Sequence, residues 1–243
     1  KGEDTIQISF TILEQLPSAS AVGNIALEAR LNVNLTVNEF DSISYSYIGD
    51  NPHQDKFSIN PSTGALETNT MIDRETITDC ADTLDCVLVL NFVAQSSRTS
   101  FFKLIIASIN IIDINDHAPS FSQPIFTLNI SESTITPVGS RFTVPTAVDK
   151  DTGKNGILSY NRYPSDGPFG LNVSKKLDGS FHVQIVLKEL LDREKQESYN
   201  LQIAARDGGD QPQTGILNVN VNVLDINDNA PTFDRSKYNI TVK

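Results

Sequence analysis

Two nine-residue segments of this chain concentrate carboxylate and amide side chains. Residues 113–121 read DINDHAPSF and residues 225–233 read DINDNAPTF, so seven of the nine positions are identical at a separation of 112 residues. The first four residues of each segment offer two carboxylates and one amide. Calcium takes about six to eight oxygen ligands from such groups and from backbone carbonyls. Both segments are therefore candidate calcium-binding motifs.

Further acidic motifs occur in the same order in both halves of the chain. An Asp-Arg-Glu triplet precedes each nine-residue segment, and a glutamate lies 59 or 60 residues before the triplet; these acids are Glu14, Asp73 and Glu75, and then Glu132, Asp192 and Glu194. One segment rich in Asp, Asn and Gly would indicate only a turn, and paired carboxylates also serve acid–base enzymes. Repetition in the same order favours metal binding over both alternatives.

The recurrence of ordered motifs predicts tandem domains. We place the domains at residues 1–117 and 118–229, and we interpret residues 230–243 as the truncated start of a third unit. Asp73 precedes Asp113 by 40 residues, whereas Asp192 precedes Asp225 by 33. The longer interval contains a seven-residue segment bounded by two cysteines. One inserted loop in the first copy accounts for the difference.

The elements that carry these motifs are predicted to be strands. Valine, isoleucine and threonine are abundant, and long apolar stripes at helical spacing are absent. Strands are expected at 42–48, 86–94 and 101–112 in the first domain and at 126–130, 181–187, 199–206 and 215–224 in the second. Many short strands in about 110 residues predict an all-β fold of two antiparallel sandwiches.

Bulk composition excludes several function classes. The net charge of −11 disfavours nucleic acid as a partner, because phosphate binding needs basic patches. With three histidines and neither a nucleophile elbow nor a phosphate loop, the chain is not expected to be an enzyme. No apolar run reaches the about 18 residues that a membrane-spanning helix needs.

Taken together, the repeated motifs resemble those of cadherin repeats over nearly the whole chain. The resemblance implies seven-stranded Greek-key (immunoglobulin-like) sandwiches and three calcium ions at each junction between repeats. Carried over position by position, the ligands of the first junction are Glu14, Asp73, Glu75, Asp113, Asn115, Asp116, Asp149, Asp151 and Asp207, with the backbone carbonyls of Ile114 and His117 and the carbonyl of Asn155. The second junction has half of a set, and it should bind calcium weakly through Glu132, Asp192, Glu194, Asp225, Ile226, Asn227, Asp228 and Asn229.

His117 and the two cysteines need separate interpretations. The family usually has Asn at the position of His117, where a backbone oxygen is the expected ligand. The alternative, a transition-metal ligand, lacks a neighbouring His or Cys. Cys80 and Cys86 are close in sequence without an accompanying His, which favours a disulfide over zinc, with two free thiols as the alternative. Protocadherins, a branch of this family, often carry this cysteine spacing in their first repeat.

The resemblance also implies a cellular role and a place in a longer protein. The positions equivalent to Asp149 and Asp207 in the first copy hold Leu31 and Gln95, so we expect the first domain to be membrane-distal. The absence of Trp excludes the exchange of an N-terminal Trp between partners. We therefore expect calcium-dependent, homophilic cell–cell adhesion on the extracellular side of the plasma membrane, by a single-pass membrane protein. The expected partner is a second copy on an opposing cell, paired antiparallel along the first four repeats.

A heterophilic signalling or tension-bearing receptor is the alternative to homophilic adhesion. The two-repeat fragment itself is expected to be monomeric and soluble. Four sequons fit a secretory route and make their asparagines candidates for glycosylation, namely Asn34, Asn129, Asn172 and Asn239.

Overall fold

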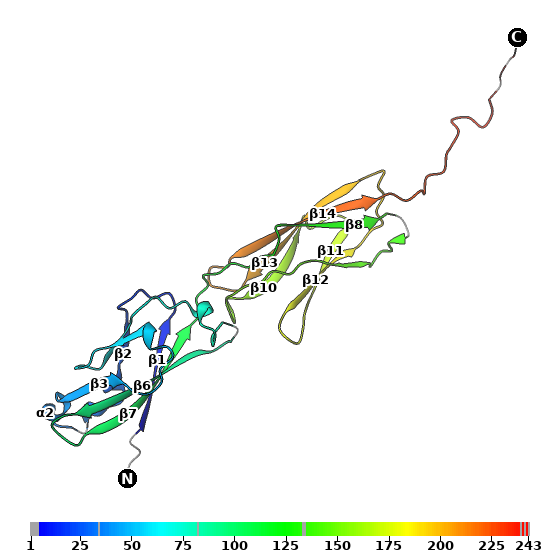
Figure 1. Cartoon of the computed structure of the whole chain (residues 1–243). Coiled ribbons are helices and arrows are strands. Elements are labelled where there is room, and N and C mark those ends of the chain that lie inside the picture. The colour runs from blue at the N-terminus through cyan, green and yellow to red at the C-terminus, as the bar shows by residue number, and fades with distance from the viewer. Residues whose placement is uncertain are drawn as a thin grey trace. The chain divides into compact units, whose positions relative to one another are not determined.

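The computed structural model describes residues 5–33, 35–81, 83–132, 135–238, 240 and 242 (Figure 1). The chain divides into two compact units. The first unit comprises Lys1–Ala118 together with the loops Asp149–Gly156 and Asp207–Gln213, and the second comprises Pro119–Val148, Ile157–Arg206 and Thr214–Lys243. Within the described ranges, no helix is both long and apolar enough to cross a membrane.

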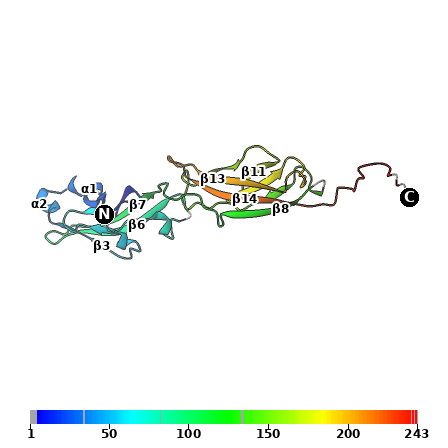
Figure 2. The same ribbon diagram turned by 90° about the horizontal axis from the view of Figure 1, so that it is seen from above.

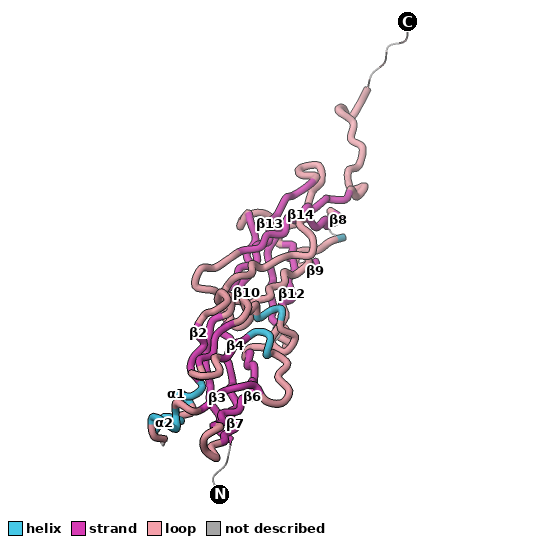
Figure 3. The backbone as a smooth tube through the Cα atoms, turned by 60° about the vertical axis from the view of Figure 1, so that its left-hand side comes forward, coloured by secondary structure: helices cyan, strands magenta, loops and turns pink. Residues whose placement is uncertain are grey.

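The first unit is a sandwich of two sheets. Its sheets have the strand orders β1-β7-β6-β3 and β2-β5-β4 (Figure 1). The strands are β1 (Thr5–Leu13), β2 (Ala21–Asn24), β3 (Ile43–Tyr47), β4 (Phe57–Ile59), β5 (Ala65–Thr68), β6 (Cys86–Ser96) and β7 (Phe102–Ile112). The helical segments, which are short, are α1 (Ile25–Glu28), α2 (Val37–Phe40), η1 (Leu31–Val33), η2 (Gln54–Lys56) and η3 (Arg74–Thr76) (Figure 3).

The second unit repeats this arrangement. Its sheets have the strand orders β10-β13-β14-β8 and β11-β12-β9, and β13, β14 and β8 run side by side in Figure 2. The strands are β8 (Ile125–Ser131), β9 (Arg141–Thr143), β10 (Ile157–Tyr163), β11 (Phe169–Lys175), β12 (Phe181–Leu187), β13 (Ser198–Asp207) and β14 (Thr214–Leu224). Among the described residues, seven strands in each unit agree with the predicted immunoglobulin-like sandwich.

Alternating side chains build the core of each sandwich. Along β6, Leu88, Leu90 and Phe92 are fully buried, while Val87 and Val89 on the other face are exposed. Successive side chains of a strand point to opposite faces, so this alternation directs one face of the sheet inward. A separate cluster forms the core of the second unit. Each repeat therefore has its own hydrophobic core.

One feature of the pairing differs from the expected antiparallel sandwich. The first strand of each unit pairs in parallel with the last, β1 with β7 and β8 with β14. Parallel neighbours need a long crossover connection, and here the rest of each sandwich supplies it. This pairing brings the end of β1 beside the end of β7, where the acidic motifs lie.

The inserted loop of the first repeat lies directly before β6. Asp73 precedes the first residue of β6, Cys86, by 13 positions, whereas Asp192 precedes the first residue of β13, Ser198, by six. Cys80 and Cys86 form a disulfide that closes this loop, as predicted. Both cysteines are buried.

Candidate calcium-binding site

Glu14 organises the acidic cluster of the first unit. It follows β1, and its side chain is buried. Its Oε2 accepts a hydrogen bond from the backbone N–H of Arg74 at 2.8 Å, and its Oε1 accepts one from the N–H of Ile114, also at 2.8 Å. One carboxylate thereby joins three segments that are far apart in sequence.

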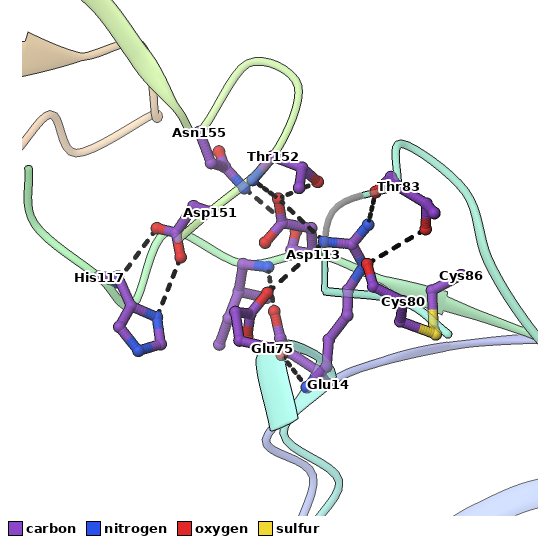
Figure 4. Close-up of polar contacts among 12 residues, drawn as sticks. Glu14, Glu75, Cys80, Thr83, Cys86, Asp113, His117, Asp151, Thr152 and Asn155 are labelled. Carbon is purple, nitrogen blue, oxygen red and sulfur yellow. Dashed lines mark hydrogen bonds and ion pairs between the residues drawn. A yellow bond between two sulfur atoms is a disulfide. The ribbon is translucent and has the colours of Figure 1, made fainter. Parts of the chain in front are cut away.

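The loop 149–156 closes over the segment that follows β7. Asp113 Oδ2 accepts hydrogen bonds from the backbone N–H and the hydroxyl of Thr152, at 2.7 and 2.9 Å. The Asn155 side-chain amide donates to the backbone carbonyl of Asp113 at 3.2 Å (Figure 4). Within the loop, Asp149 Oδ1 accepts from the N–H of Asp151 at 3.2 Å. Both predicted acids of this loop therefore lie in the first unit.

The loop 207–213 reaches the same cluster. Asp207 is fully buried and accepts hydrogen bonds from the N–H groups of Gly209 and Gln213, at 3.1 and 2.9 Å. The side chain of Gln213 donates to the backbone carbonyl of Asn115 at 2.9 Å, and Asn115 Nδ2 donates to the carbonyl of Gln211 at 2.9 Å. The loop and the segment that follows β7 thus each donate a side-chain amide to a backbone carbonyl of the other.

His117 lies among carboxylates. Its backbone N–H donates to Asp151 Oδ2 at 3.1 Å, and its Nδ1 lies 2.7 Å from Asp116 Oδ1 and 3.1 Å from Asp151 Oδ1 (Figure 4 shows the contact with Asp151). These carboxylates raise the pKa of His117, although burial of the ring acts in the opposite direction and is the largest single influence. The other oxygen of Asp116 accepts from the side chain of Gln15 at 2.8 Å.

Five buried oxygen atoms of the cluster accept no hydrogen bond. They are the only buried side-chain oxygens without a partner among the residues that the structure describes: Asp73 Oδ1, Glu75 Oε2, Asp113 Oδ1, Asn115 Oδ1 and Asp149 Oδ2. Buried polar atoms almost always have partners, and charged ones are paired or bind metal. All five belong to the predicted ligand set. A hard cation with oxygen ligands fits this donor set.

Burial, and to a smaller extent neighbouring acids, disfavours the charged forms of several carboxylates in the cluster. Burial, partly offset by hydrogen bonds from the backbone, raises the pKa of Glu14 to about 7, and neighbouring Glu75 adds to the effect. Burial likewise raises the pKa values of Asp149 and Asp151 to about 6. Side-chain oxygens of Glu14, Glu75 and Asp113 lie within 4.8 Å of one another. A divalent cation would relieve this repulsion.

The second repeat has a glutamate that makes the same backbone hydrogen bonds as Glu14. Glu132 accepts from the N–H groups of Arg193 and Ile226 at 2.5 and 2.9 Å, as Glu14 does from their counterparts, and these bonds lower its pKa. Oxygens of Glu132, Asp192 and Glu194 lie within 4.8 Å of one another. Lys195 pairs with Asp192 at 2.6 Å, and the side chain of Asp225 is 62% exposed.

The remaining predicted residues of this second set follow β14. Asp228 N donates to the carbonyl of Ile226 at 2.6 Å, and Asn229 Nδ2 donates to Asp228 Oδ1 at 3.0 Å. Asn227 belongs to the same segment. Asn129 is exposed on β8, while Asn172 is half-buried and donates to Gln184 Oε1 at 3.2 Å. Asn34 and Asn239 lie outside the described residues.

Sequence reasoning missed four residues that hold the predicted ligands in place. Gln15, Thr152 and Gln213 each donate to a predicted ligand residue, and Arg74 lies fully buried beside two of them. The first three belong to no repeated motif. Arg74 is part of the Asp-Arg-Glu triplet, and this repetition was the available signal.

Comparison with family models assigns both repeats. The model described as "Cadherin domain" matches residues 126–224, and the model described as "Cadherin-like" matches residues 7–96. Among curated proteins, protocadherin gamma-C4 from Homo sapiens is 37% identical over 97% of this chain, and human protocadherin gamma-B4 is 36% identical over 97%. The chain spans 24% of the length of each of these relatives.

Solved structures of related ectodomains have the same fold. A crystal structure of protocadherin gamma C5 EC1-3 superimposes with a TM-score of 0.81 at 32% identity, covering 95% of this chain and 70% of that one. The protocadherin gammaB4 extracellular domain gives a TM-score of 0.81 at 34% identity, covering 96% and 34%. With both repeats matched by family models and related ectodomains sharing the fold, the chain belongs to the cadherin superfamily and is protocadherin-like.

Proposed function

We propose that this chain is part of a calcium-dependent cell–cell adhesion receptor and that calcium binds at the acidic cluster of the first unit. The five buried oxygens without hydrogen-bond partners are the observation that carries the proposal. Calcium prefers hard oxygen ligands in numbers that carboxylates and amides together can supply. The ligands are those predicted from the sequence, including the carbonyl oxygens of Ile114, His117 and Asn155.

Charge balance supports several ions at this cluster. It contains eight acidic side chains: Glu14, Asp73, Glu75, Asp113, Asp116, Asp149, Asp151 and Asp207. Three calcium ions, the number that the family resemblance implies, would bring six positive charges. Without metal, like charges at about 5 Å repel one another by roughly 1–3 kcal/mol per pair, depending on the local dielectric. Calcium would therefore stabilise the cluster strongly.

The consequence for the protein is mechanical. The loops Asp149–Gly156 and Asp207–Gln213 belong to the first unit but are continuous in the chain with strands of the second. Ions bound to these loops and to Glu14 and Asp113 would fix where the second repeat begins. Without calcium, the acidic side chains would repel one another again, and the segment between the two repeats would become less rigid. At the second repeat, calcium would bind weakly because Lys195 already pairs with Asp192 and the side chain of Asp225 is largely exposed.

The role in adhesion rests on the relatives. They are protocadherins, and this chain corresponds to a quarter of their length. We propose homophilic recognition between copies on opposing cells, with antiparallel pairing along the first four repeats and this segment at the membrane-distal end. The whole protein would then be anchored in the plasma membrane with these repeats outside the cell.

Bead aggregation tests this proposal. Beads coated with the complete ectodomain should aggregate in about 1 mM calcium and disperse in chelator. Beads coated with a second, unrelated protocadherin should not join the aggregates. Aggregation in chelator would contradict the calcium requirement, and aggregation only with another protein would replace homophilic with heterophilic recognition.

A further inference from the structure

The inserted loop of the first repeat contacts the calcium cluster through one buried side chain. Nη2 of Arg74 donates hydrogen bonds to the backbone carbonyls of Thr83 and Leu84, the latter at 3.4 Å. Both residues lie between Cys80 and Cys86 in the disulfide-closed loop. Arg74 therefore connects this loop to the Asp-Arg-Glu triplet to which it belongs.

The other end of the guanidinium group faces two predicted ligands. Nη1 of Arg74 lies 3.5 Å from Glu75 Oε1 and 3.9 Å from Asp113 Oδ2. Of the same two carboxylates, Glu75 Oε2 and Asp113 Oδ1 are the oxygens without a partner. Arg74 thus lies beside one oxygen of each carboxylate and leaves the other available for a cation.

The second repeat shows the same triplet without the loop. Arg193 occupies the position of Arg74, and no insertion separates its triplet from the following strand. The Arg193 side chain is 35% exposed, whereas that of Arg74 is fully buried. The Arg193 Nε lies 3.4 Å from Asp225 Oδ1, in a pair open to solvent. Burial of the arginine therefore accompanies the inserted loop.

The loop holds its own carbonyls in place. The hydroxyl of Thr83 donates to the carbonyl of Asp85 at 2.8 Å and also lies 3.1 Å from the carbonyl of Cys80. The N–H of Cys80 donates to the carbonyl of Ile77 at 2.9 Å. Together with the disulfide, these bonds restrict the loop, so the two acceptors of Arg74 have a defined position.

We propose that the disulfide-closed loop is a positioning element for the calcium site, acting through Arg74. This inference rests on the proposed calcium function of the cluster. The loop fixes the guanidinium group, and the guanidinium group orients Glu75 and Asp113 toward the metal. Partners that orient metal ligands typically change metal affinity about 10- to 100-fold when they are removed.

Calcium titration of three variants tests this inference. Cys80→Ser/Cys86→Ser opens the loop. Arg74→Lys removes the guanidinium group that contacts both the loop carbonyls and the two predicted ligands. Each variant should bind calcium at the cluster about tenfold more weakly. Thr83→Val removes the hydroxyl that restrains the loop and should weaken binding about threefold, as expected for one hydrogen bond. Ser180→Ala is the matched control, because it removes a hydroxyl from a loop of the second unit, where Ser180 Oγ bonds Asp178 at 2.7 Å. Its calcium affinity should equal that of the unaltered protein.

Hydrogen exchange supplies a measurement that needs no variant. If the loop strengthens calcium binding, calcium must stabilise the loop by the same factor, because coupling between two sites is reciprocal. Calcium should therefore slow amide exchange in residues 80–86 of the unaltered protein. This result holds even if the cysteine variant fails to fold, and a loop with a purely structural role would exchange at the same rate with and without calcium.

The outcomes separate the two proposals. The positioning role alone would be overturned by three results together. The unaltered protein would bind calcium normally, Thr83→Val and Arg74→Lys would bind it with unchanged affinity, and calcium would not change amide exchange in the loop. Absence of calcium binding by the unaltered protein would overturn the proposed function and this inference together. Weaker binding in Thr83→Val at an unchanged melting temperature in chelator would support the inference.

Discussion

Asp113→Asn separates metal binding from folding at this cluster. An asparagine carbonyl can still accept the two hydrogen bonds that Thr152 donates to Asp113 Oδ2. The amide nitrogen would then replace Asp113 Oδ1, the buried oxygen that has no partner. The substitution therefore exchanges one predicted ligand atom for a hydrogen-bond donor and removes one negative charge, while it preserves the local geometry.

The size of the effect follows from burial. A unit charge about 4 Å from another contributes about 1 kcal/mol in water and about 4 kcal/mol at an effective dielectric constant of 20, and a divalent ion doubles these values. The Asp113 side chain is 13% exposed, so the stronger limit is closer. Water that replaces the lost oxygen recovers part of the energy. We expect calcium affinity to fall about 10- to 100-fold, which corresponds to about 1.4–2.8 kcal/mol.

Isothermal titration calorimetry in a calcium-free buffer measures this change. Asp210→Asn is the matched control, because Asp210 lies on a loop of the same unit with its side chain 92% exposed and paired with Lys154. The control has the same net charge as Asp113→Asn and should retain normal affinity. In chelator, Asp113→Asn should melt no lower than the unaltered protein, since one repelling charge is gone. A dissociation constant within about twofold of normal would refute the assignment of Asp113 as a ligand.

Three further outcomes are expected. Alkylation without reductant should leave Cys80 and Cys86 unmodified in the intact mass, and two added groups would contradict the disulfide. Burial raises the pKa of Glu14 to about 7 and those of Asp149 and Asp151 to about 6, so calcium must displace protons from these groups. Calcium titrations in two buffers should show proton release and weaker binding at pH 6 than at pH 8. The metal-free fold should lose stability as the pH rises through these pKa values, because the folded state favours the protonated acids. Sedimentation equilibrium in millimolar calcium should show a monomer, because two repeats lack the counterparts that antiparallel pairing requires; a tight calcium-dependent dimer would exclude that pairing.

Periodicity made several strands predictable from the sequence, although β1, which leads to Glu14, was not among those expected. The strand expected at 181–187 is β12. The strand expected at 86–94 is β6, which extends two residues further, to Ser96. Alternating apolar residues specify a strand and its buried face, because side chains of a strand alternate between faces. They do not specify which strand lies beside it. The parallel pairing of β1 with β7 was therefore missed, although it places Glu14 beside Ile114.

The acidic residues of the site could be predicted because they recur in motifs, and their supporting contacts could not. Thr152 and Gln213 are single polar residues whose partners lie far away in sequence. Arg74 could be located from its triplet, but its burial depends on an inserted loop that only the folded chain places over it. Contacts of this kind depend on tertiary packing, which leaves no periodic trace in the sequence.

Equilibrium dialysis against calcium, with the bound metal counted per chain, tests the central claim most directly. The cluster should bind about three ions with dissociation constants near 10⁻⁴–10⁻³ M, and Asp113→Asn should lower the occupancy at about 1 mM calcium. Partial binding at the second repeat would add a weaker component that this substitution leaves unchanged. A chain that binds no calcium at several millimolar free metal would contradict the claim that the buried oxygens of the first unit are calcium ligands.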